Sequence, residues 1–323
     1  MKVLPVPSFG YSPETRTYVG AVALFTFKLY ADTATRTSNA KLEFNYTWNK
    51  QVIVEAGWNY FFDHEVWFTK GTAQYSKYPD LYYGIGQNTP DEGKLIYNSN
   101  RMVLEAFGLR NIGNHIFVGP NVRYINYSKV GWGNDTVTYP ELVDASSTGI
   151  GISVLKDSRN SLLTPITGIF AYGNATYNIA SGNYVKLTLD LRYYKTWKEK
   201  HTLALRFINE FNTGKPPFYD YAFLGGDKYV RGYYYGRFRD NGLSSLQTEY
   251  RFPIIWRIGL AAFGGLSGIY SSLSDLGIES LKYNYGLGLR FLIDRKEGIN
   301  LRLDYAIGKQ NNYGFYISFG ESF

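Results

Sequence analysis

Hydrophobic and polar residues alternate with a period of two along many stretches of this chain. Such alternation places successive side chains on opposite faces of a β-strand, so each stretch is predicted to be a strand with one apolar and one polar face. The polar faces carry charged residues in strand after strand. The apolar series are Leu42, Phe44, Tyr46 and Trp48; Val52, Val54, Ala56, Trp58 and Tyr60; Val185, Leu187, Leu189, Leu191 and Tyr193; Leu203, Leu205 and Phe207; and Ile299, Leu301, Leu303, Tyr305 and Ile307.

The strands are about ten residues long, the length of a tilted membrane-spanning strand. Aromatic residues make up 18% of the 323 residues, yet the composition is slightly polar on average. A soluble sandwich could place its polar faces in water, but a sandwich of this length without helices and with so many aromatics is disfavoured. We therefore predict an all-β fold, a transmembrane antiparallel β-barrel of about 16 strands. It would span residues 17–323 as one domain, after an extended entry segment at 1–16.

The connections between strands are predicted to alternate in length, as in outer-membrane barrels with long extracellular loops and short periplasmic turns. Long connections are expected at 30–38, 69–91, 130–146 and 212–240, and short ones near Lys50 and at 111–114, 198–200 and 294–298. The longest apolar run, 18–27, is about half the length of a spanning helix. Residues 1–7 contain no apolar region of an export signal. Because a barrel must be exported, we expect its signal to have been removed.

A glycine-rich stretch with a single arginine among aromatic residues lies in the expected connection 212–240. By composition it is most typical of an ordinary surface loop with exposed tyrosines. The strand that follows changes this interpretation, because its polar face carries an acid, Glu249. A loop with an isolated Arg231 next to that face predicts a loop folded back against the strand.

Six segments occur in a characteristic order along the chain. They are PSFGYSPETRTYVG (Pro7–Gly20), GIGISVLKDSRNSLLTPITG (Gly149–Gly168), LGGDKYVRGY (Leu224–Tyr233), EYRFP (Glu249–Pro253), GLGLRF (Gly286–Phe291) and RLDYAIG (Arg302–Gly308). In this order they resemble the BamA/TamA superfamily of outer-membrane barrels, also called the bacterial surface antigen family. The resemblance covers nearly the whole chain.

This resemblance implies that an extracellular loop enters the barrel lumen and is held there by its arginine. The loop residues concerned are Val230, Arg231, Gly232 and Tyr233, and strand parity makes Glu249 the inward acid that pairs with Arg231. The family often has a second inward Asp where Gly265 stands here. Arg231 would therefore have one acidic partner or a different second one.

The C-terminal stretch alternates as a final strand and resembles an outer-membrane assembly signal. The residues expected on one lipid-facing side are Phe315, Ile317, Phe319 and Phe323, with Glu321 where an aromatic is more usual. The alternative is a last strand that happens to end in Phe.

No constellation for catalysis or metal binding is found in the sequence, so no enzyme activity and no cofactor are expected. There is no Cys, which excludes disulfides and thiolate metal sites. His64, His115 and His201 lack the spacing of a zinc site. The arginines and tyrosines of 231–239 could suit single-stranded nucleic acid, but a structural plug is favoured. The charge of +7 suits anionic lipid headgroups.

Two functions remain open for this barrel. The first is assisting protein insertion into, or translocation across, the outer membrane of a Gram-negative bacterium. The second is a plugged pore or a structural anchor without transport-assembly activity. Insertase members of the family carry periplasmic polypeptide-transport-associated (POTRA) domains ahead of the barrel, and only 1–16 precede the first expected strand here. Either these domains have been removed, or the chain resembles a barrel-only member that lacks them. Expected partners are outer-membrane lipid, unfolded or nascent outer-membrane proteins and periplasmic assembly factors, with no nucleic acid and a monomeric barrel.

Overall fold

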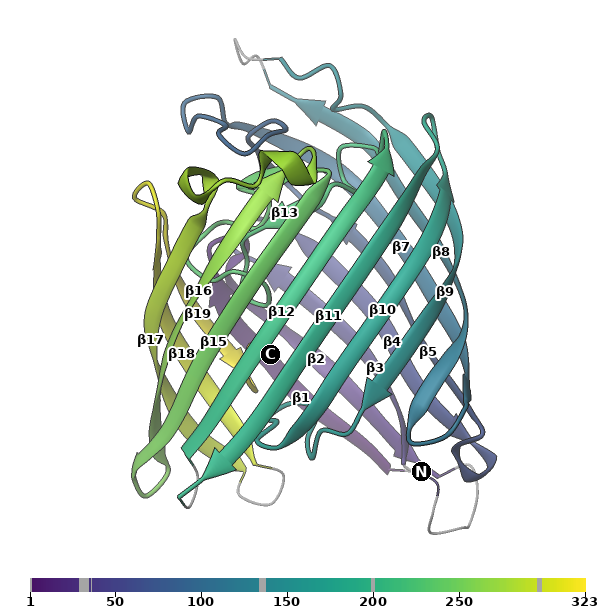
Figure 1. Cartoon of the computed structure of the whole chain (residues 1–323), viewed down its shortest axis with the longest axis vertical. Coiled ribbons are helices and arrows are strands. Elements are labelled where there is room, and N and C mark those ends of the chain that lie inside the picture. Colours follow the sequence, from purple (N-terminus) through teal and green to yellow (C-terminus); the bar gives the residue numbers. More distant parts are fainter. Residues whose placement is uncertain (1, 29–34, 36, 134–137, 199–200, 295–297) are drawn as a thin grey trace.

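The computed structural model of the chain describes residues 2–28, 35, 37–133, 138–198, 201–294 and 298–323. Within these ranges sixteen long strands pair with their neighbours in sequence, all antiparallel, and the last strand returns to the first (Figure 1). The closed antiparallel barrel predicted from the alternation is confirmed. No described helix is long and apolar enough to cross a membrane.

The first half of the barrel is formed by the strands nearest the N-terminus. They are β1 (Lys2–Ser12), β2 (Arg16–Phe27), β3 (Ser38–Thr47), β4 (Val52–Phe62), β5 (Trp67–Lys77), β7 (Leu95–Asn111), β8 (Ile116–Trp132) and β9 (Ala145–Asp157). The short strand β6 (Asp80–Tyr82) pairs with β7 above the barrel wall. A 3-10 turn, η1 (Asp63–Glu65), joins β4 to β5.

The second half contains the longest connection, which carries two short strands of its own. The elements are β10 (Gly168–Ile179), β11 (Tyr184–Trp197), β12 (His201–Gly214), β13 (Ala222–Leu224), β14 (Phe238–Asp240), β15 (Gly242–Ile255), β16 (Ile258–Tyr270), η2 (Leu273–Asp275), η3 (Ile278–Ser280), β17 (Lys282–Asp294), β18 (Ile299–Gly308) and β19 (Tyr313–Phe319). Strands β13 and β14 pair with each other and not with the barrel.

Strand pairing begins earlier than the expected boundary at residue 17. The segment expected as an extended entry contains β1, which pairs with β2 from Lys2 to Ser12. Pro5 and Pro7 lie in this strand although proline cannot donate to a ladder. Among the described residues, the pairing of β1 with β19 on its other side consists of one pair, Tyr11 with Ile317. A strand that is paired mainly along one edge can contain prolines.

Three of the long connections lie at the end of the barrel opposite the N-terminus, at the top of Figure 1. They join β5 to β7, β8 to β9 and β12 to β15. Two expectations about connections were wrong in detail. Strand β5 continues to Lys77, so the connection expected at 69–91 begins only after that residue. The turn near Lys50, expected at the short-turn end, lies at the long-loop end, because β3 is antiparallel to β2 and runs toward the long loops. The connection expected at 30–38 falls largely outside the described residues.

The outward faces of the strands are apolar and exposed, and the inward faces hold the buried charges. Leu287 is 67% exposed and Ile152 is 63% exposed, whereas Glu249 and Asp304 are completely buried. This arrangement reverses that of a soluble protein and follows from lipid outside and a polar lumen inside.

Leu287→Arg places a charge at the middle of β17 on the lipid face. We expect it to lower the free energy of unfolding from detergent or lipid by about 2–4 kcal/mol, because arginine is costly at the bilayer midplane. Ile278→Arg, at an 89% exposed position in η3 outside the barrel wall, is the matched control and should change it little. Equal effects in reversible urea titrations would contradict the assignment of faces.

Candidate functional site

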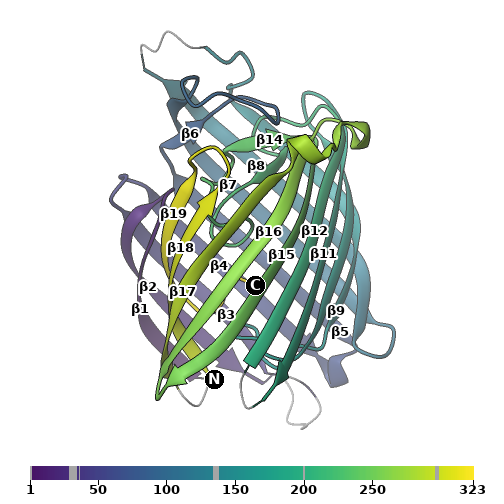
Figure 2. The same cartoon turned by 60° about the vertical axis from the view of Figure 1, so that its left-hand side comes forward.

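The connection 215–241 between β12 and β15, here called the lumen loop, folds back inside the ring of strands (Figures 1 and 2). Its tight turns need glycine, since Gly225, Gly226 and Gly232 have φ values of 116°, 85° and 99°. Val230 and Tyr233 have no exposed surface. They belong to an apolar cluster with Ala222, Leu224, Phe238, Leu243 and Ile269.

Arg231 lies at the centre of the site and binds two acids of the barrel wall. Its Nη2 donates to Glu249 on β15, and its Nη1 donates to Asp304 on β18. The guanidinium carbon lies 3.5 Å from the centroid of the Phe263 ring on β16. The structure thus brings together the arginine and the acid that sequence parity placed on facing surfaces, and it adds a second acid.

Asp304 is the second acidic partner of Arg231. The space beside Gly265, where the family often has an Asp, is occupied by residues of the neighbouring strand β15. A Cβ added at Gly265 would lie 2.6 Å from the carbonyl oxygen of Leu246 and 2.1 Å from the side-chain amide Nε2 of Gln247. That amide donates to Ser245 and Asn284. An aspartate at 265 therefore has no room here, and the second carboxylate comes from β18 instead. Asp304 lies on the polar side of the alternating series 299–307, so the sequence indicates its inward facing but not its pairing with Arg231.

The ion pairs of Arg231 are part of a larger charge cluster inside the barrel. Four guanidinium groups face four carboxylates, so the cluster is neutral as a whole. Arg290 bridges three of the carboxylates, with Nη1 2.5 Å from Asp304, Nη2 3.3 Å from Glu249 and Nε 2.8 Å from Glu321. The members are Asp227, Arg231, Glu249, Arg251, Arg290, Arg302, Asp304 and Glu321.

Small residues on the wall make room for this cluster and for the loop tyrosines. A Cβ at Gly288 would lie 1.9 Å from Oδ1 of Asp304, and one at Gly308 would lie 2.5 Å from the ring of Tyr233. The Tyr233 hydroxyl donates to the carbonyl of Tyr283 at 2.7 Å and accepts from the Lys309 amide at 2.6 Å. Burial raises the pKa of Tyr233 to about 12, so this phenol stays neutral and keeps its proton for donation.

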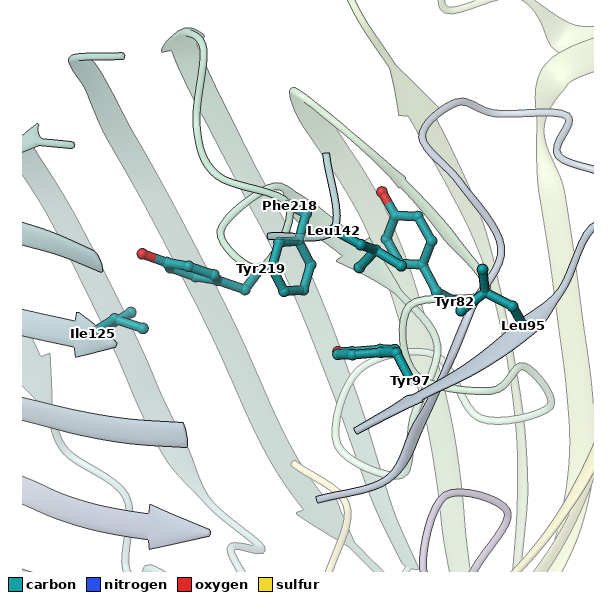
Figure 3. Close-up of a cluster of buried hydrophobic side chains, with 7 residues drawn as sticks. All are labelled: Tyr82, Leu95, Tyr97, Ile125, Leu142, Phe218 and Tyr219. Atoms are coloured by element: carbon teal, nitrogen blue, oxygen red, sulfur yellow. The ribbon is translucent and has the colours of Figure 1, made fainter. Parts of the chain in front are cut away.

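The entry limb of the loop is attached to the opposite wall. Asp220 accepts both Nη groups of Arg123 on β8 at 2.8 and 3.0 Å, and Nζ of Lys186 on β11 at 2.9 Å. Beside it, Phe218 and Tyr219 enter an aromatic cluster at the long-loop end of the barrel (Figure 3). The cluster joins them to Tyr82, Leu95, Tyr97, Ile125 and Leu142. The loop therefore bridges the lumen from β8 and β11 to β15 and β18.

The C-terminal residues do not all face lipid as expected. Phe315 is 40% exposed on the outer face, but Phe323 is 4% exposed and packs inside the barrel against Tyr194 and Ala204. The alternation ends at Phe319, and Gly320, with φ of 77°, turns the chain inward. The placement of Phe323 on the lipid-facing side was therefore wrong, because parity was carried past the end of the strand.

Arg231→Ala should lower stability and expose the lumen loop to protease. The cost is expected to be about 1–3 kcal/mol, because two buried carboxylates each lose a charged donor. Arg231→Lys should rescue only part of this loss, since an ammonium cannot hold both acids with a planar fork. Arg237→Ala is the control, because Arg237 binds Thr89 of another long-loop connection and none of the wall acids.

Double-mutant cycles measure how strongly Arg231 is coupled to each of the two acids in the free energy of unfolding. We expect measurable coupling of Arg231 with both Glu249→Gln and Asp304→Asn in the free energy of unfolding. Coupling with neither acid would mean that aromatic packing alone holds the loop.

Comparisons with known proteins agree with the barrel fold. The model of the Omp85 superfamily domain matches residues 25–323. BamA from Haemophilus ducreyi lacking POTRA domains 1–3 is similar with a TM-score of 0.67 and 11% identity, over 99% of this chain and 70% of that one. CdiB from Acinetobacter baumannii gives a TM-score of 0.65 and 11% identity, over 99% of this chain and 60% of that one. No curated protein sequence matches the chain. The fold indicates the outer membrane of a Gram-negative bacterium, and the chain belongs to the Omp85 superfamily.

Proposed function

We propose that this barrel assists the insertion of proteins into, or their translocation across, the outer membrane by opening between β1 and β19. The main support for the proposal is the small number of residue pairs between these two strands. Among the described residues it contains only the pair Tyr11–Ile317, whereas β18 and β19 pair continuously from Leu301 to Ile307. Most backbone groups on the facing edges of β1 and β19 are thus available to an incoming strand.

Side-chain contacts keep this junction closed in the resting barrel. Phe9 meets Phe319 edge to face at 5.1 Å between ring centroids, and Tyr11 lies 5.8 Å from Phe315. Aromatic contacts of this kind contribute about 0.5–1.5 kcal/mol each beyond their burial. They can be replaced by the side chains of another strand without loss of ladder bonds elsewhere in the barrel.

The lumen loop touches both sides of the same junction. The Gly232 amide donates to the hydroxyl of Tyr316 on β19 at 3.0 Å. The Tyr235 amide donates to the carboxylate of Glu14, directly after β1, at 2.7 Å. A loop held by Arg231 therefore supports the closed junction, and its release would remove the contacts with Tyr316 of β19 and with Glu14 in the turn after β1.

A disulfide across the junction tests this function. The chain has no native Cys, so Tyr11→Cys with Ile317→Cys introduces the only thiols. We expect the oxidised variant to lose its activity in assembling outer-membrane proteins in cells of the source organism, and reduction to restore it. Leu191→Cys with Phe207→Cys, a pair inside the continuous ladder of β11 and β12, is the control and should stay active. Full activity of the oxidised junction variant would exclude opening at this place.

The alternative is a plugged pore or a structural anchor, and the loop that crosses the lumen also supports this function. For a plugged pore, the relevant feature is the space that the loop leaves open in the lumen. Cavities of about 330 and 410 Å³ lie along β2–β12, and both are lined by Glu105, Phe107 and Tyr172. The lumen loop forms one side of the first cavity.

We expect only small currents from the resting protein in planar bilayers, because the loop fills the other side of the lumen. Arg231→Ala should raise the frequency of larger openings, whereas the Arg237→Ala control should not. Large, steady, porin-like currents from the unmodified protein would argue against a loop that closes the lumen.

A further inference from the structure

Residues 320–323, here called the tail, leave the barrel wall and lie inside it. Figures 1 and 2 place the C-terminal end within the outline of the barrel in two views 60° apart. Gly320 makes the turn, and a Cβ at this position would lie 2.8 Å from the carbonyl oxygen of Leu163. The three residues that follow are held by side chains and carbonyls from five strands, from the connection between β9 and β10 and from the lumen loop, which together form the tail seat.

The aromatic end of the tail occupies an apolar pocket with a fixed donor beside it. The Phe323 ring packs on Tyr194 of β11 and Ala204 of β12. The Nη2 of Arg251 on β15 donates to the backbone oxygen of Phe323 at 2.9 Å. This guanidinium is oriented by two further bonds, from Nη1 to the carbonyl of Pro165 at 2.9 Å and from Nε to Glu249 at 2.6 Å.

The acid of the tail is held as tightly as its aromatic residue. The Glu321 carboxylate, 2% exposed, accepts Nε of Arg290 at 2.8 Å and Nδ2 of Asn300 at 2.9 Å. The Glu321 amide donates to the carbonyl of Leu163 at 2.8 Å. The Ser322 hydroxyl donates to the carbonyl of Asp227 in the lumen loop at 2.6 Å.

The hairpin motif at 157–168 supplies one side of the seat. Asp157 accepts Nε and Nη2 of Arg159 at 2.9 and 2.7 Å. The side chain of Asn160 accepts the amides of residues 166 and 167, both at 3.0 Å. These bonds fix the connection between β9 and β10, so the carbonyls of Leu163 and Pro165 are presented to the tail and to Arg251.

We propose that the tail seat is a peptide-binding site for short acid-x-aromatic segments, and that the chain's own Glu321-Ser322-Phe323 is its resident ligand. Apart from the Ser322 hydroxyl bond to Asp227, its contacts use one carboxylate, one aromatic ring and backbone groups, which any polypeptide with this pattern carries. The proposal goes beyond the proposed function, because the seat belongs to the folded barrel whether or not the barrel assembles proteins.

Occupancy of the seat also supports the lumen loop. Arg251 and Arg290 bind Glu321 and Glu249 at the same time, and Glu249 is a partner of Arg231. When the tail leaves, these two guanidinium groups lose a carboxylate, and Asp227 loses the bond from Ser322. The loop should then open more often.

The experiment uses a variant that ends at Phe319, purified in detergent, and a fluorescent Gly-Glu-Ser-Phe peptide. We expect saturable binding by fluorescence anisotropy. The Glu321→Gln and Phe323→Ala versions of the peptide should bind at least about tenfold more weakly, the loss expected for one charged or aromatic contact. The full-length protein should also bind at least about tenfold more weakly, because its seat is occupied.

A full-length variant with Glu321→Gln and Phe323→Ala provides the same test without shortening the chain. Both variants should show faster proteolysis of the lumen loop, and added peptide should slow it again. No saturable binding by either variant, or equal binding of the three peptides, would overturn the proposal. Peptide binding is measured on purified protein, so its result is independent of the assembly assay in cells.

Discussion

Charge buried inside the barrel is the constraint on which the rest of the structure depends. Arg231 is 3% exposed, and its partners Glu249 and Asp304 have no exposed surface. Charged groups removed from water are tolerated only when they are paired and hydrogen-bonded, and removing one partner costs far more than losing a surface ion pair. Because the partners lie on β15 and β18, the loop cannot withdraw without breaking ion pairs on two strands at once. The lumen loop is therefore held in place by an electrostatic penalty as well as by packing.

Strand parity and the order of motifs were enough to predict the barrel and the facing of Arg231 and Glu249. Parity also placed Asp304 on an inward face, but it could not identify Asp304 as a partner. That assignment requires knowing which strands lie next to the loop once the sheet has closed, and closure is a long-range property. Gly265 illustrates the same limit, since no acid fits there because of the Leu246 carbonyl and the Gln247 side chain, whose positions follow from the folded sheet.

The two ends of the chain show where local patterns stop being informative. Pro5 and Pro7 favour an extended entry over a strand, and they are tolerated because β1 is paired mainly along one edge. Phe323 continues the parity of Phe319 in the sequence, yet Gly320 breaks the strand between them. Both departures from the local pattern occur at the junction of β1 and β19, where the described strands are paired least.

Three elements converge on that junction from inside the lumen. The loop binds Tyr316 and Glu14 on its two sides, the tail continues from β19, and the charge cluster joins the tail to the loop through Arg251 and Arg290. If opening of the junction and release of the loop are coupled in this way, the coupling is reciprocal: whatever favours one favours the other by the same free energy. A ligand that displaces the tail would then loosen the loop, and a strand that pairs with β1 would weaken the hold of the seat on the tail. Several moderate contacts that share residues hold the loop, the tail and the junction together, and under the proposed function they would break together when one of them is replaced.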